Sequence, residues 1–374
     1  MVKRVGVIGG GQLAWMMADG AKKLGLELVV QTPSGDDPAV AIATYSIFAA
    51  IDDATATAQL ADRAEVITFE NEFIDLIGLS HLADRGVQFC PSLQALTPLL
   101  DKFDQRSYLQ QHGLPTPEFR LLQGSSGIAA LGFPVVLKAR RHGYDGKGTF
   151  IVRTPDAFPI PRDAIAPDQW LLEAFVPFQG ELAVMAARSP KGEIAIYPVV
   201  ETQQVDQVCR RVFVTSDWSL EIVEQVNAIA RTLLTSLNFV GIMGIEFFLT
   251  PEGKVLVNET APRTHNSGHY SLDACVTSQF EQQLRCVSNL PLGDPSLNCP
   301  GAVMINLLGH ESMMQNGDDR RQTLTQIPNA HLYWYNKTPR PGRKLGHVTV
   351  TLEAGQGRAE AEEMGRSVEE IWYG

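Results

Sequence analysis

Residues 244–259 read GIEFFLTPEGKVLVNE, in which two largely apolar runs flank a Pro-Glu-Gly turn. The pattern predicts a β-hairpin with strands Gly244–Thr250 and Lys254–Glu259. A two-residue loop would pair Glu246 with Glu259, whereas a three-residue loop would pair Glu246 with Asn258 and leave Glu259 on the diagonal. Either register gathers oxygen-bearing side chains among apolar neighbours.

Two carboxylates facing each other in an apolar sheet need a shared proton or a cation, because like charges directly opposite each other are destabilising. Ligation by oxygen atoms favours Mg²⁺, which proteins hold through one or two carboxylates together with substrate phosphates. We therefore expect Glu246 and Glu259 to be metal ligands. The alternative is an exposed hairpin whose glutamates are solvated.

A glycine-rich loop precedes this hairpin in the sequence. Residues 143–148 contain three glycines and follow the expected buried strand Pro134–Lys138. Glycines let a backbone approach phosphates closely and offer N–H donors. The segment is not a Walker motif, because Arg141 stands at the first glycine position and Gly148 at the Ser/Thr position. Taken by itself, the loop could also be an ordinary turn. Its place between Lys138 of the preceding strand and the carboxylate hairpin favours phosphate binding.

The first ninety residues alternate strand and helix patterns, which predicts a doubly wound parallel sheet. The expected strands are Val5–Ile8, Leu26–Gln31, Val66–Phe69 and Val87–Cys90, and the expected helices are Gln12–Lys23, Ala54–Arg63 and Ile74–Arg85. Between the first strand and helix, residues 9–14 match the dinucleotide fingerprint G-x-G-x-x-A. The second strand ends in Gln31 rather than the acid that would hold a ribose. A nicotinamide cofactor and a ligand-free turn remain alternatives, and a loop lining a substrate pocket is favoured.

The rest of the chain has an α+β pattern. We expect a helix ending at Gln111, strands Glu181–Arg188 and Glu193–Val200, an amphipathic helix Leu220–Leu237, and a small β module from about residue 301. The predicted domains are 1–98 (Rossmann-like), 99–179 (small lobe with the glycine loop), 180–300 (large lobe with the hairpin) and 301–374 (C-terminal β module).

Composition excludes several classes of function. The 374 residues carry a formal net charge of −11, which argues against nucleic-acid binding. No stretch approaches the roughly 20 apolar residues that span a bilayer. The five scattered cysteines form no CxxC pair and predict free thiols in the cytoplasm.

Three smaller clusters are candidates for ligand contact. Lys337, Arg340, Arg343 and Lys344 form a basic turn that is either an anion site or a solvated surface. The pair of histidines at 265 and 269 lacks the glutamate of a zinc-peptidase motif, which leaves a polar loop beside the hairpin as the better interpretation. Glu70-Asn71-Glu72 follows a strand, where ligand contact and a helix cap are both reasonable.

These segments together resemble the ATP-grasp superfamily and, within it, the 5-(carboxyamino)imidazole ribonucleotide synthetase family. The resemblance runs nearly end to end. It rests on Gly9–Leu13, Gly143–Gly148, Asn258–His269, His331–Lys337 and Arg340–Lys344. It implies an ATP-grasp fold and the conversion of ATP, bicarbonate and 5-aminoimidazole ribonucleotide into the carbamate, ADP and phosphate, with Mg²⁺ as cofactor. It also implies a homodimer.

The resemblance further implies a set of site residues. ATP would be bound by Lys102, Lys138, Gly143, Gly146, Gly148, the hinge Glu173, Ala174, Phe175 and Val176, and by Glu181, Gln204 and Asn258. Asn258 would join Glu246 and Glu259 at the metal. Gln204 stands where the family often has a nucleotide-contacting histidine, which puts that contact in doubt.

The predicted catalytic residues are Asp145, Lys147, Tyr144 and Arg263. Our hypothesis is that Asp145 orients or deprotonates the amine and Lys147 steadies the carboxyphosphate, and the resemblance assigns Lys337 and Arg343 to the ribonucleotide 5′-phosphate. The ribonucleotide would be bound by Gly11, Gln12, Leu13, Glu70, Glu72, His265, Asn266, Lys337 and Arg343. A formate-dependent glycinamide ribonucleotide transformylase, another ATP-grasp carboxylate–amine ligase and an NAD(P)-dependent oxidoreductase are the alternatives.

Overall fold

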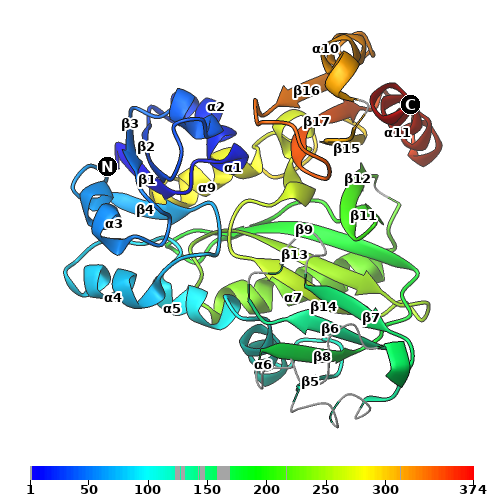
Figure 1. The fold of residues 1–374 in the computed structure, drawn as a ribbon, viewed down its shortest axis with the longest axis horizontal. Helices are drawn as coiled ribbons and strands as arrows, with labels where there is room; N and C mark the ends of the chain where they lie inside the picture. Colours follow the sequence, from blue (N-terminus) through cyan, green and yellow to red (C-terminus); the bar gives the residue numbers. More distant parts are fainter. Residues whose placement is uncertain are drawn as a thin grey trace.

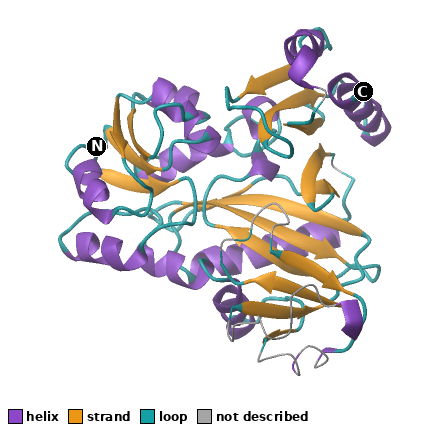
Figure 2. Ribbon diagram, in the orientation of Figure 1, coloured by secondary structure: helices purple, strands orange, loops and turns teal. Residues whose placement is uncertain are grey.

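Three β-sheets organise the molecule (Figure 1). The computed structural model describes residues 2–122, 127, 131–141, 143, 148–157, 169–215, 217–311 and 313–374, with the backbone alone at 313–316. In Figure 1 the N-terminal sheet lies at the upper left and the C-terminal helices at the upper right, both above the long strands of the central sheet. A smaller sheet packs near the hairpin end of the central one (Figure 2).

The N-terminal sheet has four parallel strands in the order β3-β2-β1-β4. They are β1 (Arg4–Ile8), β2 (Glu27–Thr32), β3 (Tyr45–Phe48) and β4 (Val66–Phe69). The helices are α1 (Gln12–Trp15), α2 (Ala18–Leu24), α3 (Ala54–Ala61), α4 (Leu76–Asp84) and α5 (Leu93–Leu96). The doubly wound parallel sheet predicted from the sequence is confirmed.

Three local expectations for this sheet were wrong. Residues 87–90 make one isolated parallel bridge, Ile67 to Phe89, instead of a strand. The short edge strand β3 was missed, because its exposed Tyr45 and Phe48 do not give the pattern of a buried strand. The expected helix from Gln12 to Lys23 is two helices, since a turn at residues 16–17 interrupts the α-helix.

The smaller sheet is antiparallel, with the order β5-β8-β6-β7. Its strands are β5 (Phe119–Leu121), β6 (Val135–Ala139), β7 (Thr149–Val152) and β8 (Trp170–Ala174). Helix α6 (Lys102–Gln111) begins at Asp101, whose carboxylate accepts hydrogen bonds from the N–H groups of residues 103 and 104. This capping fixes the direction in which the first turn of α6 points.

The central sheet has nine strands, β14-β13-β9-β11-β12-β15-β17-β16 with β10 beside β9. Its first part contains β9 (Gly180–Arg188), β10 (Ile194–Ile196), β11 (Val200–Val205), β12 (Val208–Val214), β13 (Gly241–Leu249) and β14 (Val255–Ala261). Helix α7 (Leu220–Ser236) buries Val226, Ile229 and Leu233 against β9 and β13. The β9 side chains on the opposite face of the sheet belong to a second apolar cluster, which includes Cys286 of helix α9 (Gln279–Val287). Both faces of β9 and β13 are therefore buried, and the two strands are rigid supports.

The last seventy residues extend this sheet through β15 (Ala302–Leu308), β17 (Lys344–Thr351) and β16 (Ala330–Trp334). Helices α10 (Met313–Leu324) and α11 (Arg358–Tyr373) accompany them, and neither helix was anticipated. Helix α11 buries Ala361, Gly365, Val368 and Trp372. Their spacing in the sequence is that of one face of a helix, so the pattern could have been recognised.

Several short segments complete the structure. Helix α8 spans Ser271–Ala274, and 3₁₀ turns lie at Pro38–Ala41, Thr97–Leu99, Pro155–Ala157 and Asn266–Gly268. Within the described part of the chain, every helix is too short or too polar to cross a bilayer.

Candidate active site

The hairpin β13–β14 brings Glu246 directly opposite Glu259. Near the turn, Phe247 pairs with Val257, and the register then shifts by one residue, so that Asn258 is the extra residue of a bulge. Between the turn and the bulge, the strands pair as predicted for a three-residue loop. Beyond the bulge they pair as predicted for a two-residue loop, which places Glu246 opposite Glu259. Bulges re-aim side chains, and this one gathers Glu246, Asn258 and Glu259 at one place.

The two carboxylates have different electrostatic surroundings. Glu259 Oε1 lies 2.5 Å from Lys102 Nζ, and this ammonium outweighs the effect of burial and lowers the pKa of Glu259. Glu246 has a more distant basic partner, His265, whose Nε2 lies 3.8 Å away. Burial, and then the charge of Glu259, raises the pKa of Glu246 to about 7. Glu246 is thus the carboxylate whose charge is poorly compensated.

Lys138 of β6 reaches from the smaller sheet to this hairpin. Its Nζ lies 2.7 Å from Glu173 Oε2 and donates to Asn258 Oδ1 at 3.1 Å. Glu173 belongs to β8, which pairs with β6 and presents its carboxylate beside the lysine. Three residues predicted from the resemblance, on three different strands, therefore meet.

Arg106 completes this buried cluster, and it was absent from the sequence prediction. Its Nε lies 2.5 Å from Glu173 Oε1, and its Nη2 donates to the backbone carbonyl of Asn258 at 2.5 Å. The side chains of Arg106 and Glu173 are only 3% and 2% exposed. Although burial alone would raise the pKa of Glu173, Arg106 and Lys138 lower it to about 2. The carboxylate is therefore ionised and neutralises two buried cations.

The segment that enters the glycine loop is anchored to the start of α6. Asp101 Oδ1 accepts from Arg140 Nε at 2.9 Å, and Asp101 Oδ2 accepts from Arg141 Nε at 3.2 Å. Gly148 lies beside the end of β6, because its carbonyl oxygen accepts a hydrogen bond from the N–H of Ala139 at 2.7 Å. Gly143 is described too, whereas Tyr144, Asp145, Gly146 and Lys147 lie outside the described residues.

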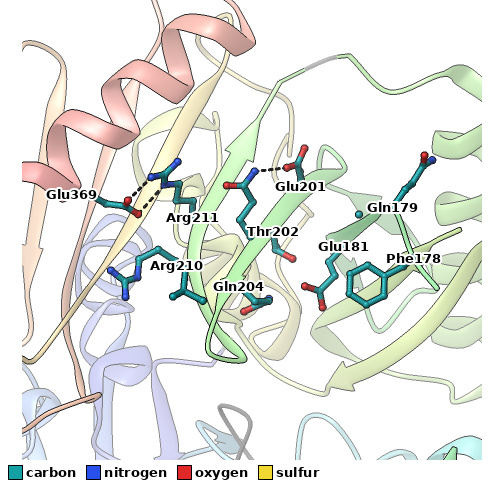
Figure 3. Close-up of a pocket in the computed structure, with 12 residues that line it drawn as sticks. Phe178, Gln179, Glu181, Glu201, Thr202, Gln204, Arg210, Arg211 and Glu369 are labelled. Atoms are coloured by element: carbon teal, nitrogen blue, oxygen red, sulfur yellow. Dashed lines mark hydrogen bonds and ion pairs between the residues drawn. The ribbon is translucent and has the colours of Figure 1, made fainter. Parts of the chain in front are cut away.

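The chain passes from the smaller to the central sheet through Ala174, Phe175 and Val176, which are half-buried. Beyond them, a pocket of about 470 Å³ is lined by Glu181 and Gln204 of the adjacent strands β9 and β11. Figure 3 shows the two side chains pointing to the same side of these strands. Burial raises the pKa of Glu181 to about 7.

The N-terminal glycine loop is occupied by a carboxylate of the protein itself. Glu70 accepts hydrogen bonds from the N–H of Gly11 at 2.5 Å and the N–H of Leu13 at 3.0 Å. A β-carbon at Gly11 would collide with this carboxylate, so the close approach requires glycine. These N–H groups begin α1, where a dinucleotide would place its pyrophosphate. The amide of Gln31 is also engaged, because its Nε2 donates to the Ala50 carbonyl at 2.7 Å.

Residues from distant parts of the chain close around this loop. Lys337, which follows β16, donates to Gln12 Oε1. Arg263, which follows β14, lies 2.9 Å from Glu72 Oε1. Arg343 is half-buried, and its Nη1 donates to the Thr338 carbonyl at 3.0 Å. The predicted ribonucleotide residues of the N-terminal sheet thus meet those of the C-terminal segment.

Two other predicted residues have partners within the protein. His265 Nδ1 lies 2.9 Å from Ser267 Oγ, and Asn266 exchanges two hydrogen bonds with Asn306 at 2.7 and 2.8 Å. Among the residues that the structure describes, no three His, Cys, Asp or Glu side chains gather as a metal-binding group. Nothing in this arrangement favours a zinc site at the histidine pair.

Known proteins match this chain over nearly its whole length. Family models match for the ribonucleotide synthetase preATP-grasp domain (residues 2–98), the ATP-grasp domain (107–280) and the phosphoribosylaminoimidazole carboxylase C-terminal domain (302–361). The N5-carboxyaminoimidazole ribonucleotide synthase of Synechococcus elongatus is 52% identical over 379 residues, covering 99% of this chain and 96% of that protein. The chain belongs to the N5-carboxyaminoimidazole ribonucleotide synthase family.

Solved structures of N5-carboxyaminoimidazole ribonucleotide synthases agree. One synthetase, in complex with ADP, superposes with a TM-score of 0.91 at 34% identity, covering 99% of this chain and 97% of that one. The Aspergillus clavatus synthase, in complex with ADP and 5-aminoimidazole ribonucleotide, gives 0.89 at 30% identity, covering 99% and 98%. The chain is therefore an ATP-dependent ligase with the ATP-grasp fold, and the transformylase and oxidoreductase alternatives are set aside.

In this member of the N5-carboxyaminoimidazole ribonucleotide synthase family, helix periodicity is a sequence signal that could have identified Arg106 as a buried residue. Lys102 and Arg106 are four residues apart and Leu109 follows at i+3, so all three share one face of α6. Leu109 is fully buried, which places Arg106 toward the interior. A buried arginine needs a carboxylate partner, but its location cannot be read from helix periodicity.

Proposed function

We propose that the cleft between the smaller sheet and the hairpin β13–β14 carboxylates the exocyclic amine of 5-aminoimidazole ribonucleotide, using ATP and bicarbonate. One observation carries this proposal: side chains from α6, β6, β13 and β14 converge at one place, namely Lys102, Lys138, Glu246, Asn258 and Glu259. The cations suit ATP phosphates, and the oxygen atoms suit a divalent metal.

The donor atoms fit Mg²⁺. Glu246, Asn258 and Glu259 offer oxygen atoms only, and the raised pKa of Glu246 marks a carboxylate that a cation would stabilise. We propose these three residues as its ligands. A bound Mg²⁺ would supply charge neutralisation to the phosphates of ATP.

The chemistry then takes two steps. An oxygen atom of bicarbonate attacks the γ-phosphorus, ADP departs, and carboxyphosphate forms while Lys102 and Lys138 stabilise the developing negative charge. The amine nitrogen next attacks the carboxyl carbon, or the CO₂ released from it. Phosphate leaves, and the amine loses one proton. Exclusion of water protects the intermediate.

We assign the ribonucleotide to the region where the N-terminal loop meets the C-terminal segment. Glu70 and Glu72 lie on one side of it, and Lys337, Arg343 and Arg263 bring positive charge in an otherwise acidic protein. Electrostatic focusing of this kind favours an anionic 5′-phosphate.

Arg343→Ala is expected to raise the KM for 5-aminoimidazole ribonucleotide about 10- to 100-fold and the KM for ATP less than threefold, the effect of losing one phosphate contact. Steady-state kinetics with each substrate varied would measure both. Arg366→Ala, which removes an exposed arginine from α11, is the matched control. Equal increases in the two KM values would contradict the assignment.

Asp145→Asn is expected to lower kcat for carbamate formation at least about 100-fold, because the amide cannot accept the amine proton. ATP affinity, measured by equilibrium binding, should change less than threefold. Undiminished product formation would remove Asp145 from the mechanism.

The decisive assay is phosphate release from ATP in two mixtures. Bicarbonate with 5-aminoimidazole ribonucleotide should support turnover, whereas formate with glycinamide ribonucleotide should not. The opposite pattern would overturn the proposed reaction.

We further propose that the protein acts in the cytoplasm as a homodimer. Its five cysteines are all described by the structure and form no disulfide, which suits a reducing compartment. Light scattering on the purified protein would give the mass of the assembly, and a mass of one chain would contradict the dimer.

A further inference from the structure

Tyr335 is a residue of the C-terminal segment that is buried in the core of the N-terminal sheet. It is 1% exposed and belongs to the cluster of Met16, Met17 and Val30. Trp15 of α1 contacts it edge-on, with ring centroids 6.3 Å apart and an interplanar angle of 73°. The ring therefore fastens the segment after β16 to the helix that begins at the glycine loop.

The hydroxyl of Tyr335 is held by a second buried residue, His347 of β17. The oxygen lies 2.6 Å from His347 Nδ1, and His347 is fully buried beneath a stacked Tyr333 ring at 4.7 Å. Burial lowers the pKa of His347 to about 3 and raises that of Tyr335, so the imidazole is neutral and the phenol keeps its proton. The geometry then has Tyr335 donating to Nδ1, with the imidazole proton on Nε2.

Stability alone gives little reason for this histidine. Its Nε2 has no hydrogen-bond partner among the described residues, and neither has Nε2 of His269, whose ring centroid lies 5.0 Å away. Both side chains are fully buried. Unpartnered polar atoms in a core cost free energy, and an apolar pair of similar size would avoid that cost. Such a feature calls for a role in function.

Lys337 lies two residues after Tyr335 in the chain, so the hydrogen bond between Tyr335 and His347 can affect the position of Lys337. Lys337 Nζ donates to Gln12 Oε1 and lies 5.7 Å from the Tyr335 ring centroid. The backbone of Tyr335 is fixed as well, since its N–H donates to the Leu345 carbonyl at 2.9 Å. The Tyr335 ring beside the Lys337 ammonium is thus held at its backbone and at its hydroxyl.

We propose that Tyr335 and His347 are positioning residues for the ribonucleotide site, holding Lys337 against the N-terminal glycine loop. The proposal rests on the proposed function, which assigns Lys337 to the ribonucleotide. It gives the buried hydrogen bond a specific effect: the bond governs affinity for 5-aminoimidazole ribonucleotide and leaves the ATP cleft unchanged.

The test compares Tyr335→Phe, His347→Leu and His347→Asn. Asparagine and leucine have nearly the same shape, but only asparagine can accept from the Tyr335 hydroxyl near the position of Nδ1. Tyr335→Phe and His347→Leu are each expected to raise the KM for 5-aminoimidazole ribonucleotide roughly fivefold to tenfold, the size of one lost buried hydrogen bond. The KM for ATP should stay within twofold, and His347→Asn should recover at least half of the loss.

The double variant Tyr335→Phe/His347→Leu should be no worse than either single variant, because both remove the same bond. Tyr197→Phe is the matched control: Tyr197 is 2% exposed, and its hydroxyl donates to the Thr277 carbonyl at 3.0 Å. It should lower Tm similarly and leave both KM values unchanged.

Equal rises in both KM values, additive single effects, or the same KM shift in the Tyr197 variant would overturn the proposal. Should His347→Leu fail to fold, the split between the two KM values in Tyr335→Phe decides the question. Wild-type protein that does not turn over 5-aminoimidazole ribonucleotide would instead refute the proposed function, and this inference with it.

Discussion

Glu246→Gln is expected to lower kcat/KM for ATP about a thousandfold while raising the thermal stability of the ligand-free protein. Glutamine keeps the shape of the side chain but removes the negative charge that would hold Mg²⁺ against the phosphates, a loss on the scale of one catalytic electrostatic contact. Glu246 carries this effect because Lys102 already neutralises Glu259.

The gain in stability follows from the sign of the pKa shift. Burial and the opposing Glu259 raise the pKa of Glu246 from 4.5 to about 7. Ionisation of this carboxyl therefore destabilises the fold increasingly as the pH rises through that range, and the full cost is present above pH 7. A neutral amide removes this penalty, and Tm at pH 8 without Mg²⁺ should rise by about 2 °C.

Kinetics at several Mg²⁺ concentrations and thermal unfolding in EDTA would measure both effects. Glu252→Gln, in the exposed turn of the same hairpin, should change neither activity nor Tm. Activity of the Glu246 variant above a tenth of wild type would argue that this residue is not a metal ligand.

The opposition of Glu246 and Glu259 could be predicted because hairpin pairing depends on residues a few positions apart. The turn at residues 251–253 and the apolar alternation limit the register to two choices. The bulge at Asn258 combines the two choices, and it could not be foreseen. Asn258 bonds there to Lys138 and Arg106, which lie more than one hundred residues earlier in the chain.

Elements at the edges of sheets were predicted less well than buried ones. Strands β1 and β2 lie inside the N-terminal sheet and show the apolar runs that identify such strands. Strand β3 is four residues long at the edge, and half of its side chains are exposed, so its pattern is weak. Helix α11 has a clear buried face, which went unrecognised because the surrounding segment was interpreted as β structure throughout.

Long-range charge partners are the part of the site that sequence reasoning leaves out. Lys102, Lys138 and Glu173 were found through a family resemblance, which gives residues but not their contacts. Arg106 forms its bonds with residues 67 and 152 positions away. Only the fold shows that Glu173, assigned to the nucleotide hinge, also serves as the shared counter-ion of two buried cations.

Arg106→Met is therefore expected to damage both stability and ATP use. Removing one partner of a buried ion pair costs about 3–5 kcal/mol, and the lower end applies here because Lys138 still pairs with Glu173. The charge balance also changes. Without Arg106, the whole negative charge of Glu173 acts on Lys138, and the electrostatic field of the Lys138 ammonium at the ATP phosphates becomes weaker. We expect kcat/KM for ATP to fall about 100-fold, a loss of roughly 3 kcal/mol in transition-state stabilisation.

Two comparison variants separate an effect on the charge balance at Lys138 from a general loss of structure. Arg106→Lys keeps the charge but cannot bond Glu173 and the Asn258 carbonyl together through a planar fork, so its ATP kinetics should be intermediate. Arg188→Met removes an arginine that donates to the Phe239 carbonyl at 3.1 Å, and it should affect urea unfolding alone. An Arg106→Met protein with lowered stability and unchanged ATP kinetics would restrict Arg106 to holding the fold, because a changed charge balance at Lys138 requires the ATP kinetics to change as well.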